Sequence, residues 1–271
     1  MKHNAGAASL RSSIRPHRGS SLLSRIELEI CVDNIRSAVA ARDGGADRLE
    51  VCGPLSVGGT TPSCGFIRRY LEVEQRIGDL TIVAMIRPHD GGFCYDSADV
   101  DTMLRDIQYA AGTGVHGFVF GALTPDREID IETCRRLIDE VRQLSAIERP
   151  LTMTFHRAFD VVTDPIKALE DLIELKFDRL LTSGLAQTAL EGADVIRQLV
   201  DHAGADIAIM AGSGINADNV AQILETTGVE NVHASAAEPN TSPGYPIDFG
   251  GNARTTRESK VRALRTAIDR I

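Results

Sequence analysis

The chain has 271 residues, of which 43% are hydrophobic and 25% are charged, values that are ordinary for a globular protein with a substantial core. Its 38 acidic residues outnumber its 29 basic residues and give a formal net charge of −9, which repels nucleic acids and anionic membranes. Because of this charge we expect no nucleic-acid partner. No stretch approaches the roughly 18 to 20 apolar residues that cross a bilayer, so we also expect no membrane partner.

Residues 1–24 form a basic, serine-rich segment at the start of the chain. This segment contains Lys2, Arg11, Arg15 and Arg18 without any acidic residue, and it lacks the apolar stretch of a secretory signal. A disordered basic tail is the common explanation of such a composition, and a mitochondrial transit peptide is the alternative. We expect a disordered tail over residues 1–24 and one domain over residues 25–271.

From residue 25 onward, short runs rich in β-branched residues alternate with segments of helical periodicity. The expected strands cover residues 26–31, 48–52, 81–87, 117–123, 151–159, 179–183, 207–211 and 231–235. The clearest helical patterns cover residues 34–43, 100–113, 131–144 and 165–176. Helix starts are expected at Asp33, Asp164 and Asn216, and helix ends at Gly44, Gly114 and Gly204.

Eight βα units in a row can close into a barrel or spread into an open sheet. The even spacing of the units, and the absence of a glycine-rich turn after the first strand, favour the barrel. After Ala236, residues 238–252 are expected to form a closing loop, and residues 255–271 a final helix. We therefore predict the α/β class and a single (β/α)8 TIM-like barrel.

Alternation along each strand separates side chains that face the lumen from those that face the helices. The polar residues expected to face inward are Glu29, Cys31, Glu50, Cys52, Arg87, Thr152, Thr154, His156, His233 and Ser235. A barrel lumen is normally filled by valine, isoleucine and leucine. Any one of these residues could simply be a satisfied core group, but charge at the ends of several strands indicates a functional site where barrel enzymes keep theirs.

The five cysteines lie between Cys31 and Cys134 without the paired spacing of small secreted domains, which favours a reducing cytoplasmic location. Cys31 and Cys52 both end a Leu-Glu-(Ile/Val)-Cys strand pattern. If the two strands are neighbours in equivalent register, the Cα atoms lie about 5 Å apart and both sulfurs can reach one ion. Two thiolates favour Cu(I), or less decisively Zn²⁺, while a disulfide and two free buried cysteines stay as alternatives.

Small residues end the last three expected strands, as in barrels that bind phosphate with these turns. The candidate anion-binding residues are Thr182, Ser183, Gly212, Ser213, Gly214, His233 and Ser235. Gly212 and Gly214 can also be explained as turn residues with positive φ. Residues 58–63, which follow the second strand, are expected to be either a mobile lid or a turn.

Several motifs occur in a specific order along the chain. They are EIC at 29–31, RLEVC at 48–52, GGTTPS at 58–63, TFHRAFD at 154–160, LTSG at 181–184 and AGSG at 211–214. With these motifs the sequence resembles the CutC copper homeostasis family from about Arg25 to Ala236. The resemblance implies a cytoplasmic TIM-like barrel, a homo-oligomer such as a dimer or tetramer, and Cu(I) bound by Cys31 and Cys52.

The loop after the third strand departs from the family pattern. It reads RPHDGGF at 87–93, whereas the family typically has Arg-Pro-Arg-Gly-Gly-Asp-Phe. Arg87, Phe93 and Tyr95 are retained. Roles of the second family arginine and of the family aspartate do not carry over directly, and His89 or Asp90 could substitute for them.

Two functions follow from this pattern. The first is a copper homeostasis protein that binds copper(I) through Cys31 and Cys52. The alternative is a barrel enzyme, an isomerase, lyase or hydrolase, that acts on a small phosphorylated or carboxylated metabolite. In the enzyme, Glu29 or Glu50 would serve as base, His156 as acid and Arg87 as anion clamp; in the copper protein, Glu29, Glu50 and His156 would shape the mouth.

Overall fold

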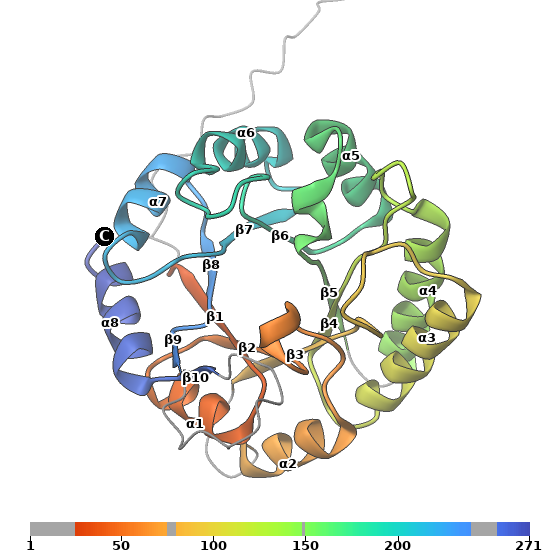
Figure 1. Ribbon diagram of the computed structural model, residues 1–271, viewed down its shortest axis with the longest axis horizontal. Coiled ribbons are helices and arrows are strands. Elements are labelled where there is room, and N and C mark those ends of the chain that lie inside the picture. Colours follow the sequence, from red (N-terminus) through yellow and green to blue (C-terminus); the bar gives the residue numbers. More distant parts are fainter. Residues whose placement is uncertain (1–24, 75–79, 148–149, 240–253) are drawn as a thin grey trace, which may run out of the picture.

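The computed structural model describes residues 25–74, 80–147, 150–239 and 254–271. Eight parallel strands pair in chain order, and β1 pairs with β8 to close a barrel (Figure 1). The strands are β1 (Glu27–Val32), β2 (Arg48–Val51), β3 (Thr81–Met85), β4 (Gly117–Phe120), β5 (Thr152–Phe155), β6 (Arg179–Thr182), β7 (Ala208–Gly212) and β8 (Asn231–Ala234). The predicted (β/α)8 barrel is confirmed; the predicted tail lies outside the described residues.

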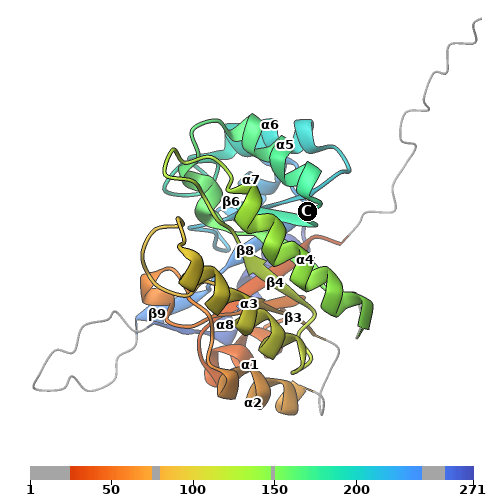
Figure 2. The same cartoon turned by 90° about the vertical axis from the view of Figure 1, so that its right-hand side faces the viewer.

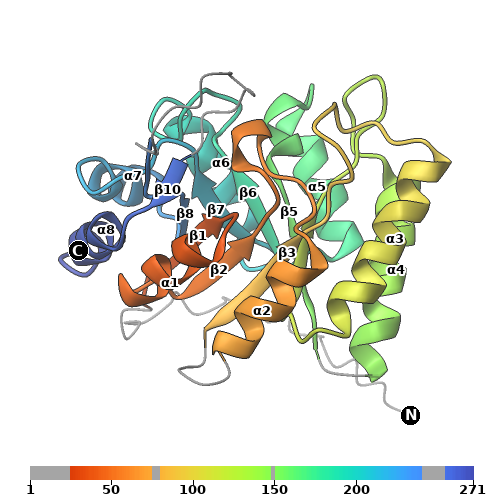
Figure 3. The same cartoon turned by 60° about the horizontal axis from the view of Figure 1, so that its bottom comes forward.

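An outer ring of helices surrounds the strands (Figure 2). The helices are α1 (Ile35–Asp43), α2 (Cys64–Glu74), α3 (Ser97–Ala111), α4 (Ile131–Ile147), α5 (Pro165–Leu175), α6 (Ala193–Ala203), α7 (Val220–Thr227) and α8 (Glu258–Ile268). Two short 3-10 helices, η1 (Leu55–Val57) and η2 (Arg157–Val161), follow β2 and β5. A two-stranded antiparallel ribbon, β9 (Ala237–Pro239) and β10 (Arg254–Thr256), precedes α8, which lies between α7 and α1 and completes the ring (Figure 3).

Several predicted boundaries were wrong. The N-cap of α1 is Asn34 rather than Asp33, because its Oδ1 accepts the Ser37 N–H. Helix α7 begins at Val220, since the segment after Asn216 forms a turn, and α3 ends at Gly112 rather than Gly114. The fifth strand ends at Phe155 because η2 follows it, whereas the predicted closing loop lies largely outside the described residues.

The expected alternation of inward and outward residues is confirmed by two separate groups of buried side chains. Leu28, Ile30, Leu49 and Val51 belong to the large apolar core between the strands and the helices. A smaller group fills the lumen and consists of Cys31, Cys52, Val83, Met85 and Val119. The lumen therefore contains both cysteines that the alternation places there.

The register of β1 and β2 differs from the expected one by two residues. Cys31 pairs with Glu50 rather than with Cys52, which lies just beyond the end of β2. A closed barrel requires its strands to be staggered, so neighbouring strands with similar sequences need not align at equivalent positions. Because the shift is even, Cys31 and Cys52 still face the same side of the sheet.

Asp47 connects β1, β2 and α8 at the N-terminal end of the barrel. Its Oδ2 accepts the backbone N–H of Leu28 at 2.8 Å and the guanidinium of Arg265 at 2.9 Å. Asp178, which precedes β6, accepts the backbone N–H of Met153 at 2.7 Å in the same way. These aspartates fix neighbouring strands against one another and so determine where the opposite strand ends lie.

No helix in the described part of the chain is long and apolar enough to cross a bilayer. The longest helix, α4, has 17 residues and includes charged side chains along its length.

Replacing Asp47 by alanine should lower the free energy of unfolding by about 2 to 3 kcal/mol, because Arg265 and the Leu28 N–H each lose a partner. Urea unfolding followed by circular dichroism measures this as a lower midpoint with an unchanged slope. The control is Asp43→Ala, at the exposed end of α1, which should change stability by less than about 0.5 kcal/mol. Equal effects of the two substitutions would contradict the role of Asp47.

Candidate functional site

A cavity of 1600 Å³ opens at the C-terminal ends of the strands. Among the side chains that line it are Cys31, Glu50, Cys52, Arg87, His156, Ser213, His233 and Ser235. The structure therefore brings the expected polar residues together at one end of the barrel. They come from β1, β2, β3, β5, β7 and β8 or from the residues that directly follow these strands.

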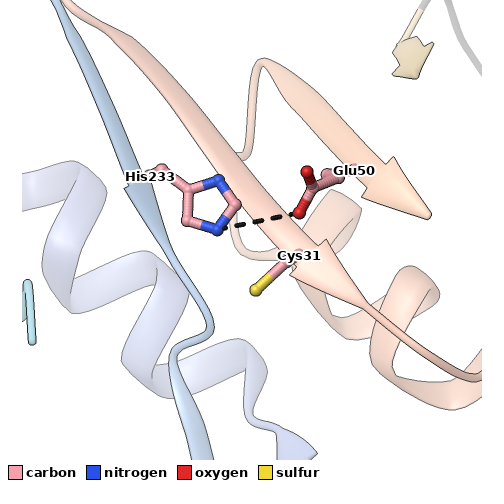
Figure 4. A group of neighbouring side chains, drawn as sticks. All are labelled: Cys31, Glu50 and His233. Atoms are coloured by element: carbon pink, nitrogen blue, oxygen red, sulfur yellow. Dashed lines mark ion pairs between the residues drawn. The ribbon is translucent and has the colours of Figure 1, made fainter. Parts of the chain in front are cut away.

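Cys31, Glu50 and His233 form a compact buried cluster at the mouth of the lumen (Figure 4). One candidate ligand atom from each residue lies within 4.8 Å of the others. The cluster arises because β1 lies between β8 and β2, with Cys31 opposite Glu50 and Glu29 opposite His233. The sequence predicted all three residues to face inward, but it did not predict that they form one group.

A chain of alternating charges leads from this cluster down the lumen. Nδ1 of His233 lies 2.6 Å from Oε1 of Glu29, and the second oxygen of Glu29 accepts Nε–H of Arg48. Arg48 also donates to Glu27 at 2.7 Å, and Glu27 in turn accepts from Arg179 at 3.0 Å. Glu29 is fully buried, so its charge depends on these two cationic neighbours.

The neighbours move the pKa values within this chain of charges in opposite directions. Burial alone would raise the pKa of Glu29, but the charge of Arg48 and the hydrogen bond from His233 hold it well below its usual range. Burial also disfavours the His233 imidazolium, yet Cys31, Glu29 and Glu50 raise its pKa well above the ordinary value. At Glu50, burial prevails and raises the pKa to about 7.

Cys52 lies next to the cluster rather than inside it. Its Sγ donates to Oε2 of Glu50 at 3.4 Å, and the same oxygen lies 3.8 Å from Nε2 of His233. Burial and the adjacent Glu50 carboxylate raise the pKa of the Cys52 thiol well above its ordinary value. Cys31 donates its thiol to the carbonyl of Ala234 at 3.7 Å. The structure therefore places Glu50 next to Cys52 and next to His233.

His156 lines the cavity as a neutral ring. Its Nδ1 accepts the Ala158 N–H at 3.3 Å and caps η2, which leaves the ring proton on Nε2. Burial, aided by the charge of Arg87, lowers the pKa of His156 to about 3. Among the described residues, none hydrogen-bonds to Nε2, although this atom is buried. The ring thus supplies an N–H donor at neutral pH rather than a cation.

Arg87 is engaged by the loops around it. Its Nη1 donates to the carbonyls of Val57 and Gly59, both at 3.0 Å, and its Nη2 donates to Gly91 at 2.6 Å. The guanidinium also lies 5.0 Å from the centre of the Phe93 ring. Segment 58–63 is thus held against the end of β3 by Arg87, whose N–H groups are largely used within the protein.

The predicted anion-binding turn after β6 already binds a carboxylate of the protein. Oδ1 of Asp160 accepts the Thr182 hydroxyl at 2.6 Å and the Ser183 N–H at 2.9 Å. Arg157 donates to the other oxygen of Asp160 at 2.6 Å. The groups of Thr182 and Ser183 that we expected to bind an external anion are therefore occupied by Asp160.

The turns after β7 and β8 remain beside the cavity. Ser213 has a φ of 82° and Gly214 a φ of 74°, and the Ser213 hydroxyl donates to the Gln187 carbonyl at 2.7 Å. A Cβ at Gly212 would meet the terminal methyl group of Leu181 at 2.5 Å, so Leu181 would have to change rotamer to admit a larger residue. Ser235 lines the cavity, and its carbonyl accepts the Thr256 hydroxyl at 3.1 Å.

Sequence reasoning missed the lower part of the lumen and the aspartate of η2. Glu27 and Arg48 have the same alternation as Glu29 and Glu50, so continuing the inward pattern toward the strand starts would have identified them. Asp160 stands at the end of the TFHRAFD motif, but nothing in its local sequence specifies that its carboxylate reaches β6.

Comparison with known proteins gives consistent matches over most of the chain. The family model described as "CutC family" matches residues 26–238. A "Copper homeostasis protein cutC homolog" of Homo sapiens is 44% identical over 238 residues, which cover 88% of this chain and 83% of that protein. A family protein CutC of Pasteurella multocida is 43% identical over 254 residues, covering 90% and 100%. The crystal structure of the putative copper homeostasis protein CutC from Streptococcus agalactiae superposes with a TM-score of 0.71 and 32% identity, covering 78% of this chain and 98% of that chain.

Replacing Glu50 by glutamine should weaken the pH dependence of stability. The folded protein keeps a proton on Glu50 up to about pH 7, whereas the unfolded chain releases it near the ordinary value of 4.5. This group therefore makes the metal-free protein less stable as pH rises through that window, and the Glu50→Gln variant lacks the contribution.

Urea unfolding of both proteins, measured at several pH values between about 5 and 8, tests this expectation. Glu132→Gln, at the exposed start of α4, is the control and should follow the wild-type profile. Parallel profiles for wild type and Glu50→Gln would show that Glu50 ionises in the folded protein as it does in the unfolded chain.

Proposed function

The chain belongs to the CutC family, and we propose that it is a copper homeostasis protein that binds Cu(I) through Cys31 and Cys52 at the mouth of its barrel. The observation that carries the proposal is the burial of both thiols in one lumen group. His233 lies beside Cys31 and supplies a nitrogen that can complete the site. Thiolate and imidazole are ligands that suit copper, and burial keeps the bound ion away from solvent.

Proton release accompanies binding in this proposal. Cu(I) binds the thiolate, so the thiol of Cys52, whose pKa is raised by burial and by Glu50, must lose its proton. The nearest acceptor is Oε2 of Glu50 at 3.4 Å. Above about pH 7, where Glu50 is ionised, its carboxylate accepts this proton while the sulfur binds the metal. Glu50 thus assists copper binding in this proposal without being a copper ligand.

Substituting both Cys31 and Cys52 by serine should abolish tight stoichiometric Cu(I) binding, because the soft ligands are lost. Competition with a chromophoric Cu(I) chelator under anaerobic conditions measures the affinity. We expect a decrease of at least roughly 100-fold, since even a change beyond the direct ligands commonly costs 10- to 100-fold. The paired control is Cys64→Ser with Cys94→Ser, which removes two exposed thiols and should leave the tight site intact.

Unchanged affinity in the Cys31→Ser, Cys52→Ser variant would reject copper binding by this pair. Loss of affinity in the Cys64→Ser, Cys94→Ser variant would place the copper on the surface instead. Single substitutions of Cys31 and Cys52 then show whether each sulfur contributes.

A second function, an enzyme that acts on a small phosphorylated or carboxylated metabolite, is favoured by a specific observation. The buried Nε2 of His156 has no hydrogen-bond partner within the described ranges, and the ring lines the 1600 Å³ cavity. A buried polar atom without a partner is costly unless a ligand or water satisfies it. A ligand with an anionic oxygen would accept this N–H, and Ser213 and Ser235 line the same cavity.

Thermal-shift measurements with phosphorylated and carboxylated metabolites test this second function. A ligand present at about 100 times its Kd stabilises the folded protein by about 2.7 kcal/mol. The variant His156→Asn keeps an acceptor that can cap η2 but lacks the Nε2 donor, so it should retain its own melting temperature and lose the shift. A broad panel without any shift in wild type would contradict the enzyme.

A further inference from the structure

We propose that Cys31, Glu50 and His233 form a three-ligand site for Zn²⁺ with a further coordination position that opens to the cavity. The site goes beyond the proposed copper function, because it uses a carboxylate that Cu(I) disfavours and does not use Cys52. The two ligand sets share Cys31 and His233, so each is tested separately through the residue that it does not share, Glu50 for zinc and Cys52 for copper.

The donor atoms of the cluster match zinc chemistry. One thiolate, one imidazole and one carboxylate are all ligands that Zn²⁺ accepts, and three protein ligands with a free position are typical of catalytic rather than structural zinc sites. Mg²⁺ and Ca²⁺ prefer sites made of oxygen atoms, and Cu(I) prefers soft sulfur ligands. The mixed set therefore favours zinc over Mg²⁺, Ca²⁺ and Cu(I).

The distances in the cluster are close to those of a filled site. Zn–S bonds of about 2.3 Å and Zn–N or Zn–O bonds of about 2.0 to 2.2 Å place tetrahedral ligands roughly 3.4 to 3.6 Å apart. Nε2 of His233 and Oε2 of Glu50 are 3.8 Å apart, and one ligand atom of each residue lies within 4.8 Å of the others. Small side-chain rotations close this difference without any movement of β1, β2 or β8.

Glu29 orients the histidine as a second carboxylate does in many zinc sites. Its Oε1 lies 2.6 Å from Nδ1 of His233, which leaves Nε2 to face Cys31 and Glu50 (Figure 4). Arg48 binds the other oxygen of Glu29 and fixes that carboxylate. A histidine held in this way through Nδ1 is an arrangement that recurs around metal ligands, and ordinary core packing does not require it.

Glu50 supplies the independent sign that a ligand is missing from the cluster. Its carboxylate is buried, yet no group within the described segments hydrogen-bonds to Oε1. A metal ion bound by both oxygens of the carboxylate would compensate its charge and also satisfy Oε1, whose burial without a partner is otherwise an unfavourable arrangement. All three ligand residues line the cavity, so water or an oxygen of a small anion can reach the remaining coordination position.

Metal binding to the metal-free protein tests the site. Zn²⁺ affinity is measured by competition with a chromophoric chelator, and Co²⁺ serves as a spectroscopic substitute whose thiolate charge-transfer band reports the Cys31 bond. We expect one Zn²⁺ per chain and a thiolate–cobalt band in wild type. Glu50→Gln should weaken Zn²⁺ binding by at least roughly 100-fold, because the carboxylate is a zinc ligand. Cu(I) keeps both of its thiolate ligands in this variant, so its affinity should fall by far less than that of Zn²⁺.

Cys52→Ser is the matched variant, for which we expect the opposite pattern of metal affinities. It should retain Zn²⁺ affinity and the cobalt band while weakening Cu(I), because Cys52 belongs only to the proposed copper pair. Glu50→Gln removes a buried charge and is expected to fold, which urea unfolding verifies independently of metal.

The outcomes separate the two proposals. Absence of the thiolate–cobalt band in wild type, or equal Zn²⁺ affinity in wild type and Glu50→Gln, overturns the zinc site and leaves the copper proposal standing. Zinc binding that is lost in Glu50→Gln supports the zinc site, even where Cu(I) fails to bind Cys31 and Cys52. Addition of azide to the cobalt protein should shift its visible spectrum, and a spectrum that does not respond overturns the open coordination position.

Discussion

The buried ion pair between Arg48 and Glu29 is the contact on which the candidate site depends. Glu29 lies fully inside the lumen, and Arg48 beside it is the cation that keeps this carboxylate ionised. An ionised Glu29 can bind Nδ1 of His233 and thereby direct Nε2 toward Cys31 and Glu50. Without Arg48 only His233 would compensate the charge of Glu29, and a buried ionic group that loses a partner is strongly destabilising. The orientation of His233 at the mouth of the lumen is thus set by Glu29 and Arg48, which lie deeper in the lumen.

Such a lumen is difficult to explain by stability alone. Replacing buried ion pairs with well-packed apolar side chains is often neutral or stabilising, and barrel interiors are usually apolar. Here apolar groups occupy only part of the interior, with Val83, Met85 and Val119 beside the two cysteines. The charged groups run from Arg179 and Glu27 to the cluster of Cys31, Glu50 and His233 in one connected series. A continuous series of this kind, which ends on a histidine with one nitrogen held in place, is better explained by a function at the mouth.

The sequence predicted those features of the site that depend on a single strand. The alternation of residues placed Glu29, Cys31 and His233 inside the barrel because inward and outward directions follow from the pleat alone. The partner of Cys31 could not be predicted, since the stagger between β1 and β2 depends on closure of all eight strands. For the same reason Asp160 was missed, because its contacts with β6 join segments from different βα units. The neutral protonation state of the His156 ring depends on its burial, which cannot be deduced from the sequence.

Glu50 connects the two metal sites that we propose, and its position makes them exclusive. Its Oε2 contacts the thiol of Cys52 and faces Nε2 of His233, so the same oxygen cannot accept a proton from sulfur and bind zinc at the same time. Cys31 is also required by both ligand sets. Under these two proposals the mouth would hold one ion at a time, and the ion that competes more strongly for Cys31 would occupy it. A protein that handles copper and a metal-assisted enzyme would in that case be two states of one site, distinguished by whether Glu50 bears a proton or a metal.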